Sequence, residues 1–322
     1  MTSEEAYRLG ANRLLDFMAE EYDGSGVSVS APDNAQFYYK LPATFAYGNR
    51  RGFAARALQQ FVQRFLDGER LSLDPFAAQW QAYLAGWVSW GAGVLGRFDL
   101  SKKVIFTVLD TQHTDYGGFV SETEIGEVQD TQRSSGAAMG CVWSGALENA
   151  IKAAKFVKYA LDNQPEPGVF YTYFNNEGKA IPVSENRMAY FSIEDQHAFP
   201  AMFGTTIASL VWLGRVTGDS AHFDTGHRFM KLVLSSKHDP ARMPLATKLG
   251  WAALMLSRHI RDDVLVDFAR RNGDDILQRQ NEDGSINFDG VPGIDKPIDK
   301  VWHIGWGCDG VLTLLALGDG VS

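Results

Sequence analysis

The stretch LDTQHTDYGGF, residues 109–119, decides the fold because altered copies of it recur along the chain. The copies are LDNQPEPGVF at 161–170, LQRQNEDGSI at 277–286 and, more loosely, FMAEEYDGSG at 17–26. Three of the four share Leu-x-x-Gln, and all reach a glycine within a few residues. Their starts fit a period of about fifty residues, and self-similarity at such a period is typical of repeat architectures.

Each unit consists of an amphipathic helix that ends at Leu-x-x-Gln, a glycine turn or longer loop, and a more apolar helix. ENAIKAAKFVKYAL (148–161) has one apolar and one charged face, whereas PAMFGTTIASLVWLG (200–214) is apolar almost all round, as expected of a helix buried on both sides. Degenerate units near Asp67 and Lys237 bring the number to six. Twelve helices in alternating outer and inner positions, with no period-two strands, predict an all-α (α/α)6 toroid that forms a single domain over residues 1–322.

Prolines support the predicted starts of the inner helices, because proline is tolerated at the first helical position, where its missing N–H costs nothing. Four inner helices are predicted to begin at Pro42, Pro75, Pro200 and Pro244. Asp74, which precedes Pro75, is a suitable N-cap.

The repeat resembles those of a known superfamily. Leu-x-x-Gln-x-x-Asp-Gly-Ser at 277–285 resembles the glutamine and tryptophan repeat of squalene and terpenoid cyclases, and DYGGF at 115–119 resembles the Gly-Gly-Phe repeat of protein prenyltransferase β subunits. GIDKPIDKVWHIGWGCDGVLTLLAL at 293–317 resembles the prenyltransferase segment in which an Asp-Lys-Pro turn precedes a His-x-x-aromatic helix start. The resemblance implies an α/α toroid.

The chain also departs from these families. Phe119, Phe170 and Ile286 replace the tryptophan that closes the cyclase repeat, and the Asp-x-Asp-Asp motif of the protonating cyclases is absent. Of the prenyltransferase zinc ligands, His303 matches the histidine and Asp130 can match the aspartate, but Gln132 stands where the cysteine is expected. A site without its thiolate would bind zinc poorly, so we expect a mechanism without metal or cofactor.

An acidic cluster on a predicted outer helix does not change this expectation. Asp262, Asp263 and Asp267 depart from the spacing of a metal-diphosphate motif. We interpret them as a solvated face.

Composition limits the class of partner. A net charge of −9 over 322 residues disfavours nucleic acid, because a phosphate backbone requires a basic patch. Two cysteines, Cys141 and Cys308, fit a reducing compartment. The start MTSEEAYRLG lacks the charge and apolar run of a signal peptide, and no apolar run reaches the roughly 18 to 20 residues of a membrane span. We expect a cytoplasmic protein without membrane insertion that acts on a small-molecule substrate, and the sequence leaves its oligomeric state open.

Two long loops are predicted to lie at the mouth of the toroid, where the loops from outer to inner helices gather. They run over 113–133 and 164–197, and loops of this length in a compact domain are usually functional. Their tyrosines and arginines are candidate substrate-binding residues: Tyr171, Tyr173, Arg187 and Arg133.

Asp195 and His197 form a candidate acid/base pair, because a carboxylate can hold a neighbouring histidine protonated or orient it as a base. Alternatively, Asp195 caps the helix near Pro200 while His197 packs at its entrance. Asp130 is a second candidate acid.

His303 is a further catalytic candidate at the start of the last inner helix. Trp302 and Trp306 are candidate substrate-binding residues beside it, and the i, i+3 spacing puts His303 and Trp306 on neighbouring positions of one face. Core packing explains the same pattern. Trp80, Tyr83, Trp87 and Trp90 likewise form either a core stripe or a cavity wall that attracts a carbocation or stacks on sugar rings.

These residues suit three functions. The favoured one is a metal-independent cyclase, isomerase or lyase that acts by side-chain acid/base catalysis on a largely apolar, terpenoid or polyene-like molecule. The alternatives are a carbohydrate-active toroid, either an unsaturated uronyl hydrolase or a sugar epimerase, and a noncatalytic prenyl-binding relative. An apolar closed cavity favours the first, a polar cleft the second and a filled cavity the third.

Overall fold

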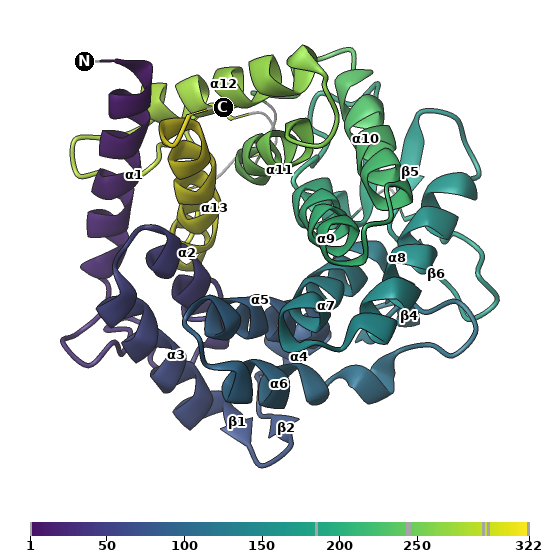
Figure 1. The fold of residues 1–322 in the computed structure, drawn as a ribbon, viewed down its shortest axis with the longest axis horizontal. Helices are drawn as coiled ribbons and strands as arrows, with labels where there is room; N and C mark the ends of the chain where they lie inside the picture. The colour runs from purple at the N-terminus through teal and green to yellow at the C-terminus, as the bar shows by residue number, and fades with distance from the viewer. Residues whose placement is uncertain (1, 184–185, 243–245, 292–293, 295–296, 321–322) are drawn as a thin grey trace.

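A computed structural model describes residues 2–183, 186–242, 246–291, 294 and 297–320. Six inner helices form a closed ring, in which each contacts the next and the last contacts the first (Figure 1). They are α2 (Leu41–Tyr47), α5 (Gln81–Val94), α7 (Thr131–Ser144), α9 (Met202–Thr217), α11 (Thr247–Ser257) and α13 (Lys300–Gly318). The predicted (α/α)6 toroid is confirmed.

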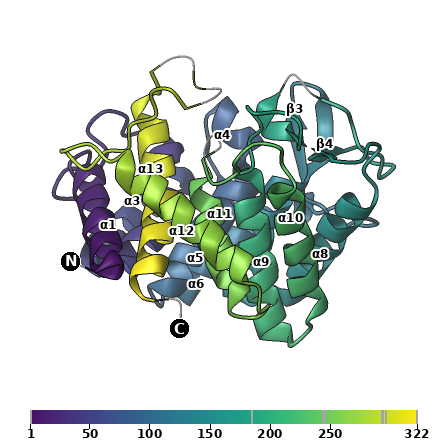
Figure 2. The same ribbon diagram turned by 90° about the horizontal axis from the view of Figure 1, so that it is seen from above.

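The outer helices each pack on the side of the inner ring. They are α1 (Ser3–Ala19), α3 (Arg51–Phe65), α6 (Phe98–Phe106), α8 (Leu147–Asp162), α10 (Ala221–Leu234) and α12 (Asp263–Gln278). α1 lies beside α12 and α13, so the two ends of the chain meet and close the ring (Figure 1). Connections from inner to outer helices are short, whereas those from outer to inner helices are long and lie together on one face (Figure 2).

Two copies of the Leu-x-x-Gln motif tie their long connections to neighbouring outer helices, whereas Gln164 of the third copy donates to Ala160 and Tyr171 within its own unit. The Gln112 amide donates to the carbonyl oxygens of Gly117 (2.8 Å) and Asn149 (2.9 Å), and Asn149 is in α8. The Gln280 amide donates in the same way to Gly284 (3.1 Å) and to Gly10 of α1 (2.9 Å). The repeated motif therefore has a structural role, and its last copy joins the end of α12 to α1.

The glycines of the repeat are required by both backbone conformation and space. Gly117 has φ +85°, and a Cβ there would lie 2.5 Å from the Lys152 carbonyl oxygen in α8. Gly284 has φ +90°, and a Cβ there would lie 2.4 Å from the Arg13 carbonyl oxygen in α1. A side chain at either position would both strain the turn and push the outer helix away.

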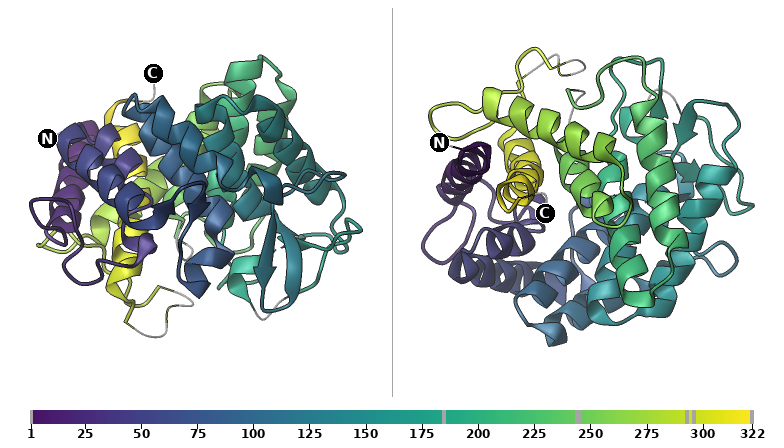
Figure 3. Two further views of the ribbon diagram at one scale, coloured as in Figure 1. Left: turned by 90° about the horizontal axis from the view of Figure 1, so that it is seen from below. Right: turned by 45° about the horizontal axis from the view of Figure 1, so that its top comes forward.

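No period-two strands were expected, and the described parts of the long connections contain seven strands of only two to five residues each. They are β1 (Leu66–Asp67), β2 (Arg70–Leu71), β3 (Val120–Thr123), β4 (Gly126–Asp130), β5 (Val169–Tyr171), β6 (Tyr173–Phe174) and β7 (Tyr190–Ser192). All pairings are antiparallel, in the orders β1-β2, β3-β4-β6 and β5-β7. β3 and β4 project from the ring on the face of the long connections (Figure 3). Such short segments give too little alternation for a sequence pattern, and their buried aromatics, such as Phe170 opposite Phe191, hold them on the ring.

The predicted proline starts are correct in part. Pro42 lies in the first turn of α2, as expected. Pro75 begins a separate short helix, α4 (Pro75–Gln79), which Asp74 caps by accepting from Phe76 and Ala77 N–H groups. α9 begins at Met202, after Pro200, and Pro244 lies outside the described residues.

Two features of α13 and α5 explain their apolar composition. We expected no apolar run long enough to cross a membrane, but among the described residues α13 passes this test by length and composition. The 18-residue stretch of α13 that passes is 67% buried inside the fold. Trp87 and Trp90 of α5 are fully buried, and Trp90 stacks on Trp251 with ring centroids 5.4 Å apart. These rings fill the toroid below the first turns of the inner helices.

Candidate active site

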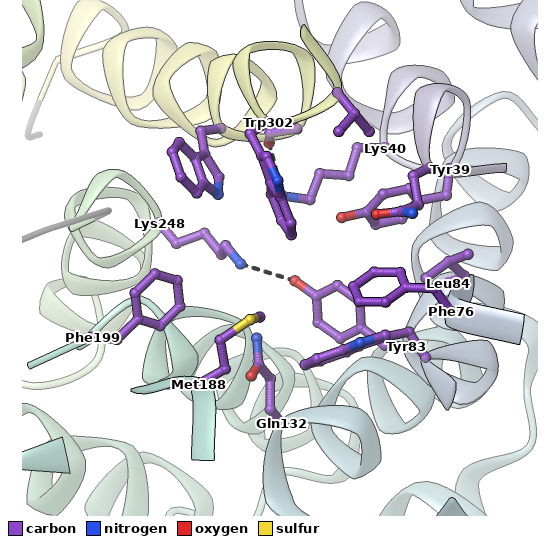
Figure 4. Close-up of a pocket in the computed structure, with 15 residues that line it drawn as sticks. Tyr39, Lys40, Phe76, Tyr83, Leu84, Gln132, Met188, Phe199, Lys248 and Trp302 are labelled. Atoms are coloured by element: carbon purple, nitrogen blue, oxygen red, sulfur yellow. Dashed lines mark hydrogen bonds between the residues drawn. The ribbon is translucent and has the colours of Figure 1, made fainter. Parts of the chain in front are cut away.

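A cavity of about 590 Å³, part of it open to solvent, lies among the N-terminal ends of the inner helices (Figure 4). Its walls are mostly aromatic or apolar and consist of Tyr39, Phe76, Trp80, Leu84, Met188, Phe199, Val301, Trp302 and Trp306. Its polar side chains are Gln36, Lys40, Tyr83, Gln132 and Lys248.

Four buried side chains form what we call the floor cluster: Lys40, Tyr83, Lys248 and Asp309. Lys40 Nζ lies 2.9 and 2.8 Å from the two carboxylate oxygens of Asp309 and also donates to the Gly305 carbonyl oxygen (2.8 Å). Lys248 Nζ lies 3.6 Å from Asp309 Oδ2. It donates to the Tyr83 hydroxyl at 3.0 Å, and Figure 4 shows these two side chains meeting across the cavity. The Asp309 carboxylate is therefore the shared counterion of Lys40 and Lys248.

The four residues come from four inner helices, three of them at or beside a helix start and Asp309 in the middle of α13. Lys40 precedes α2, Tyr83 lies in the first turn of α5, Lys248 in the first turn of α11, and Asp309 farther along α13. Glycines on the neighbouring helices make room for two of them. A Cβ at Gly136 would lie 2.6 Å from the Tyr83 ring, and one at Gly204 would lie 2.5 Å from Lys248 Cβ.

The charges of the floor cluster control the protonation of its tyrosine. Burial alone would raise the pKa of Tyr83, but the nearby Lys248 and Lys40 outweigh burial, so the Tyr83 pKa lies below its ordinary value of 10.0. Burial disfavours the charged form of Lys40, but Asp309 outweighs it and holds the Lys40 pKa above its ordinary value. Tyr83 also lies 3.3 Å from the Thr205 hydroxyl, which can exchange the donor role with it. The lysines thus stabilise the phenolate form of Tyr83.

The predicted binding residues Trp302 and Trp306 line the cavity, with ring centroids 5.4 Å apart. His303, between them, instead packs against Phe17 and Phe288 at centroid distances of 6.4 and 5.6 Å. Burial lowers its pKa, although Asp283 and Asp289 oppose the shift. Its predicted catalytic role is therefore unsupported by its position, because it is not part of the cavity lining.

Asp130 and Arg133 lie behind the cavity wall in what we call the wall cluster, together with Trp80 and Tyr173. Arg133 Nε lies 3.3 Å from Asp130 Oδ2, and the guanidinium stacks 4.4 Å from the centroid of the Trp80 ring. Tyr173 covers the guanidinium from 5.6 Å. Burial raises the pKa of Asp130, although Arg133 opposes the shift, and burial beside Asp130 raises the pKa of Tyr173 to about 12. The pair supports Trp80 and does not itself line the cavity.

The other predicted residues lie in the long connection from α8 to α9 and are not part of the cavity lining. The Asp195 carboxylate accepts from the His197 backbone N–H at 2.8 Å, so it caps a local turn and not α9. Tyr171 packs on Tyr190 and donates to Glu166. Arg187 begins a 3-10 turn, and its side chain lies outside the described residues.

No group of three metal-ligating side chains exists within the described ranges. Lys40, Lys248 and Asp309 were missing from the sequence prediction of the site, and Tyr83 was predicted only as part of an aromatic stripe that could form the cavity wall. The signal that could have found three of them is a single charge at an apolar helix: Lys40 before LPATFAY, Lys248 in TKLGWAALML and Asp309 in GCDGVLTLLAL. A charge at such a position needs a partner inside the fold.

Comparison with known proteins finds no matching protein family and no matching curated sequence. Solved structures do match over nearly their whole length. An inactive variant of an α-1,6-mannanase of glycoside hydrolase family 76 from Salegentibacter sp., in complex with α-1,6-mannotriose, has 13% identity and a TM-score of 0.70, covering 97% of this chain and 99% of its own. An unsaturated glucuronyl hydrolase specific for heparin has 13% identity and a TM-score of 0.68, covering 98% and 97%.

A second unsaturated glucuronyl hydrolase, from Bacillus sp. GL1, has 15% identity and a TM-score of 0.63, covering 98% of this chain and 96% of its own. The chain therefore has an α/α toroid fold. The resemblance to this broad class of fold is confirmed, whereas the resemblance to terpenoid cyclases in particular finds no support among these structures.

Proposed function

We propose that this protein is a carbohydrate-active enzyme in which Tyr83 exchanges a proton with the bound sugar. The observation that carries the proposal is the contact of 3.0 Å between Lys248 Nζ and the Tyr83 hydroxyl at the cavity floor. A lysine beside a buried tyrosine stabilises the phenolate, and a pKa nearer neutrality improves a general acid or base.

The mostly apolar walls taken alone would favour the cyclase, but the amide and charged groups among them favour a sugar. Trp80, Trp302 and Trp306 offer ring faces for stacking, while Gln36 and Gln132 offer amides for hydroxyl groups. Two buried lysines beneath an entirely apolar substrate would lose hydration without gaining a partner. The similarity to carbohydrate-active toroids in fold supports the same choice, so the carbohydrate alternative replaces the cyclase as our proposal.

The reaction we propose does not use two carboxylates. Glycoside hydrolysis usually needs a pair of carboxyl groups on either side of the scissile bond, and the mannanase variant is inactive with two adjacent aspartates replaced. The adjacent aspartates of this chain, Asp262–Asp263 and Asp274–Asp275, lie on the outer helix α12 or its N-cap. Asp309 is bound to both lysines. We therefore favour a reaction that depends on one tyrosine. One such reaction is hydration of an unsaturated sugar, in which Tyr83 gives its proton to the double bond, water adds to the cation formed, and the proton that this water loses returns to the phenolate; another is epimerisation, in which the proton removed from the sugar is returned to it.

The test is turnover of a panel of neutral and acidic oligosaccharides, saturated and unsaturated, followed by NMR. Tyr83→Phe removes only the hydroxyl and is expected to reduce kcat by about 10²- to 10⁴-fold. The matched control is Tyr159→Phe, because the Tyr159 hydroxyl binds the Gly178 carbonyl oxygen on the outside of the ring. Equal rates for wild type and Tyr83→Phe on a substrate of the protein would contradict the proposal.

A further inference from the structure

The floor cluster has an unequal number of buried charges. Among the described side chains it contains two cations, Lys40 and Lys248, and one carboxylate, Asp309. Their side chains are 3%, 7% and 0% exposed, so water does little to screen the difference. An uncompensated buried charge is costly, and a fold that keeps one generally supplies a counterion. Ionisation of Tyr83 would supply it in the empty cavity.

The two lysines differ in what they can still bind. Lys40 donates to both oxygens of Asp309 and to the Gly305 carbonyl oxygen, which occupies its three N–H groups. Lys248 makes one hydrogen bond within the described structure, to Tyr83, and also lines the cavity. An ammonium group has three donors. Lys248 thus keeps two donors for a ligand above the floor, 3.0 Å from the tyrosine.

We propose that the substrate is a sugar with one carboxylate, that this carboxylate binds Lys248 on the cavity floor, and that its binding is coupled to uptake of one proton by Tyr83. The inference rests on the proposed function and names its substrate class. With Tyr83 ionised, the two lysines are balanced by Asp309 and the phenolate, so the floor cluster is electrically neutral. The carboxylate of a substrate would then find no unpaired positive charge. When the carboxylate binds, the phenolate oxygen takes a proton from solvent, and the floor is neutral again.

The groups around Tyr83 support this exchange from every side. Lys248 approaches from α11, Lys40 from the turn before α2 and Asp309 from α13, while the neutral hydroxyl of Thr205 lies on α9. Tyr39, the neighbouring phenol at a centroid distance of 6.1 Å, does not compete, because burial raises its pKa. Only Tyr83 of these two phenols is favoured as the anion. In the complex Tyr83 is therefore a phenol and enters the reaction as a general acid.

The test is calorimetric binding of glucuronate, galacturonate and mannuronate, each paired with the hexose that lacks the carboxylate. At least one uronate is expected to bind roughly 10- to 100-fold more tightly than its hexose, the range of a hydrogen bond to a charged group. Titrations in two buffers with different ionisation enthalpies, at a pH between the lowered pKa of Tyr83 and 10.0, measure the protons taken up.

Two variants separate the steps. Tyr83→Phe is expected to keep the preference for the uronate and to lose proton uptake, because the floor retains its excess cation without a titrating phenol. Lys248→Met is expected to lose the preference. Thermal melting checks that both variants fold.

Each outcome supports or overturns the inference. Equal binding of hexose and uronate, with turnover that still depends on Tyr83, would overturn the inference that the substrate carries a carboxylate. The proposed function would still stand. Proton uptake that persists in Tyr83→Phe would overturn the coupling to Tyr83. Binding of neither class of sugar, at millimolar concentrations, would count against both the inference and the proposed function.

Discussion

The floor cluster and the wall cluster are both buried sets of acids and bases on the inner helices or beside them, but they differ in charge balance and access. In the wall cluster, Asp130 and Arg133 are each 1% exposed, match one to one, and lie beneath Trp80 and beside Tyr173. In the floor cluster, Asp309 faces two lysines, and Lys248 also lines the cavity. The charged side chains of both clusters are buried. The unequal charge and the open side distinguish a site from a structural ion pair.

The largest effect is expected when the one carboxylate of the floor is neutralised. Asp309→Asn leaves Lys40 and Lys248 close together with no carboxylate between them, so we expect a loss of about 5 kcal/mol in the free energy of unfolding, the upper end for broken buried pairs. Urea denaturation measures it. A loss below about 1 kcal/mol would mean that water or another group already screens the lysines.

A somewhat smaller loss is expected from the wall cluster. Arg133→Met leaves the Asp130 carboxylate buried without a partner, and we expect a loss of about 3 kcal/mol. The double variant Asp130→Asn/Arg133→Met should recover part of it, because Asn keeps the N-cap that Asp130 gives to the Gln132 N–H and carries no charge. If the double variant is less stable than Arg133→Met by the full cost of Asp130→Asn, the two residues do not interact.

The repeat motif provides a neutral reference for these charged clusters. Gln112→Ala removes the hydrogen bonds to Gly117 and Asn149, and we expect a loss of about 1–2 kcal/mol with unchanged catalysis. Thr114→Ala, an exposed residue of the same turn, is the control. A fall in kcat in Gln112→Ala at full stability would show that the turn acts on the site.

The smallest change in stability is expected at the residue most important for the proposed chemistry. Lys248→Met removes the excess cation while the Lys40–Asp309 pair remains, so we expect a change within about 1 kcal/mol, of either sign. The same variant should lose the preference for a uronate. A destabilisation as large as that of Arg133→Met would remove the difference between the two clusters.

Much of the fold follows from the sequence because its determinants are local and repeated. Gln112 and Gly117 lie within one turn, and the same pattern returns at Gln280 and Gly284. The inner helices are apolar all round because they contact neighbours on every side. The strands were not predicted, since segments as short as Tyr173–Phe174 depend on packing against the ring and not on their own pattern.

The site is harder to predict because its parts are far apart in the chain. Lys40 and Asp309 are 269 positions apart, and Tyr83 and Lys248 are 165 apart. Only the closed ring brings them together. Trp302 and Trp306 could be predicted, because their spacing within one helix places them at its mouth end. His303, in the same turn, is not part of the cavity lining and packs on Phe17 and Phe288.

The pKa of Tyr83 tests the central claim most directly. Tyrosine labelled with carbon-13 at Cζ, assigned with Tyr83→Phe, allows this phenol to be titrated by NMR in the folded protein. We predict that Tyr83 titrates below 10.0 in the free protein and that Lys248→Met raises its pKa. Because the folded pKa is lowered, this group stabilises the fold above pH 10.0, and that contribution disappears as the pH falls through the folded pKa. A Tyr83 pKa at or above 10.0, unchanged by Lys248→Met, would contradict the account.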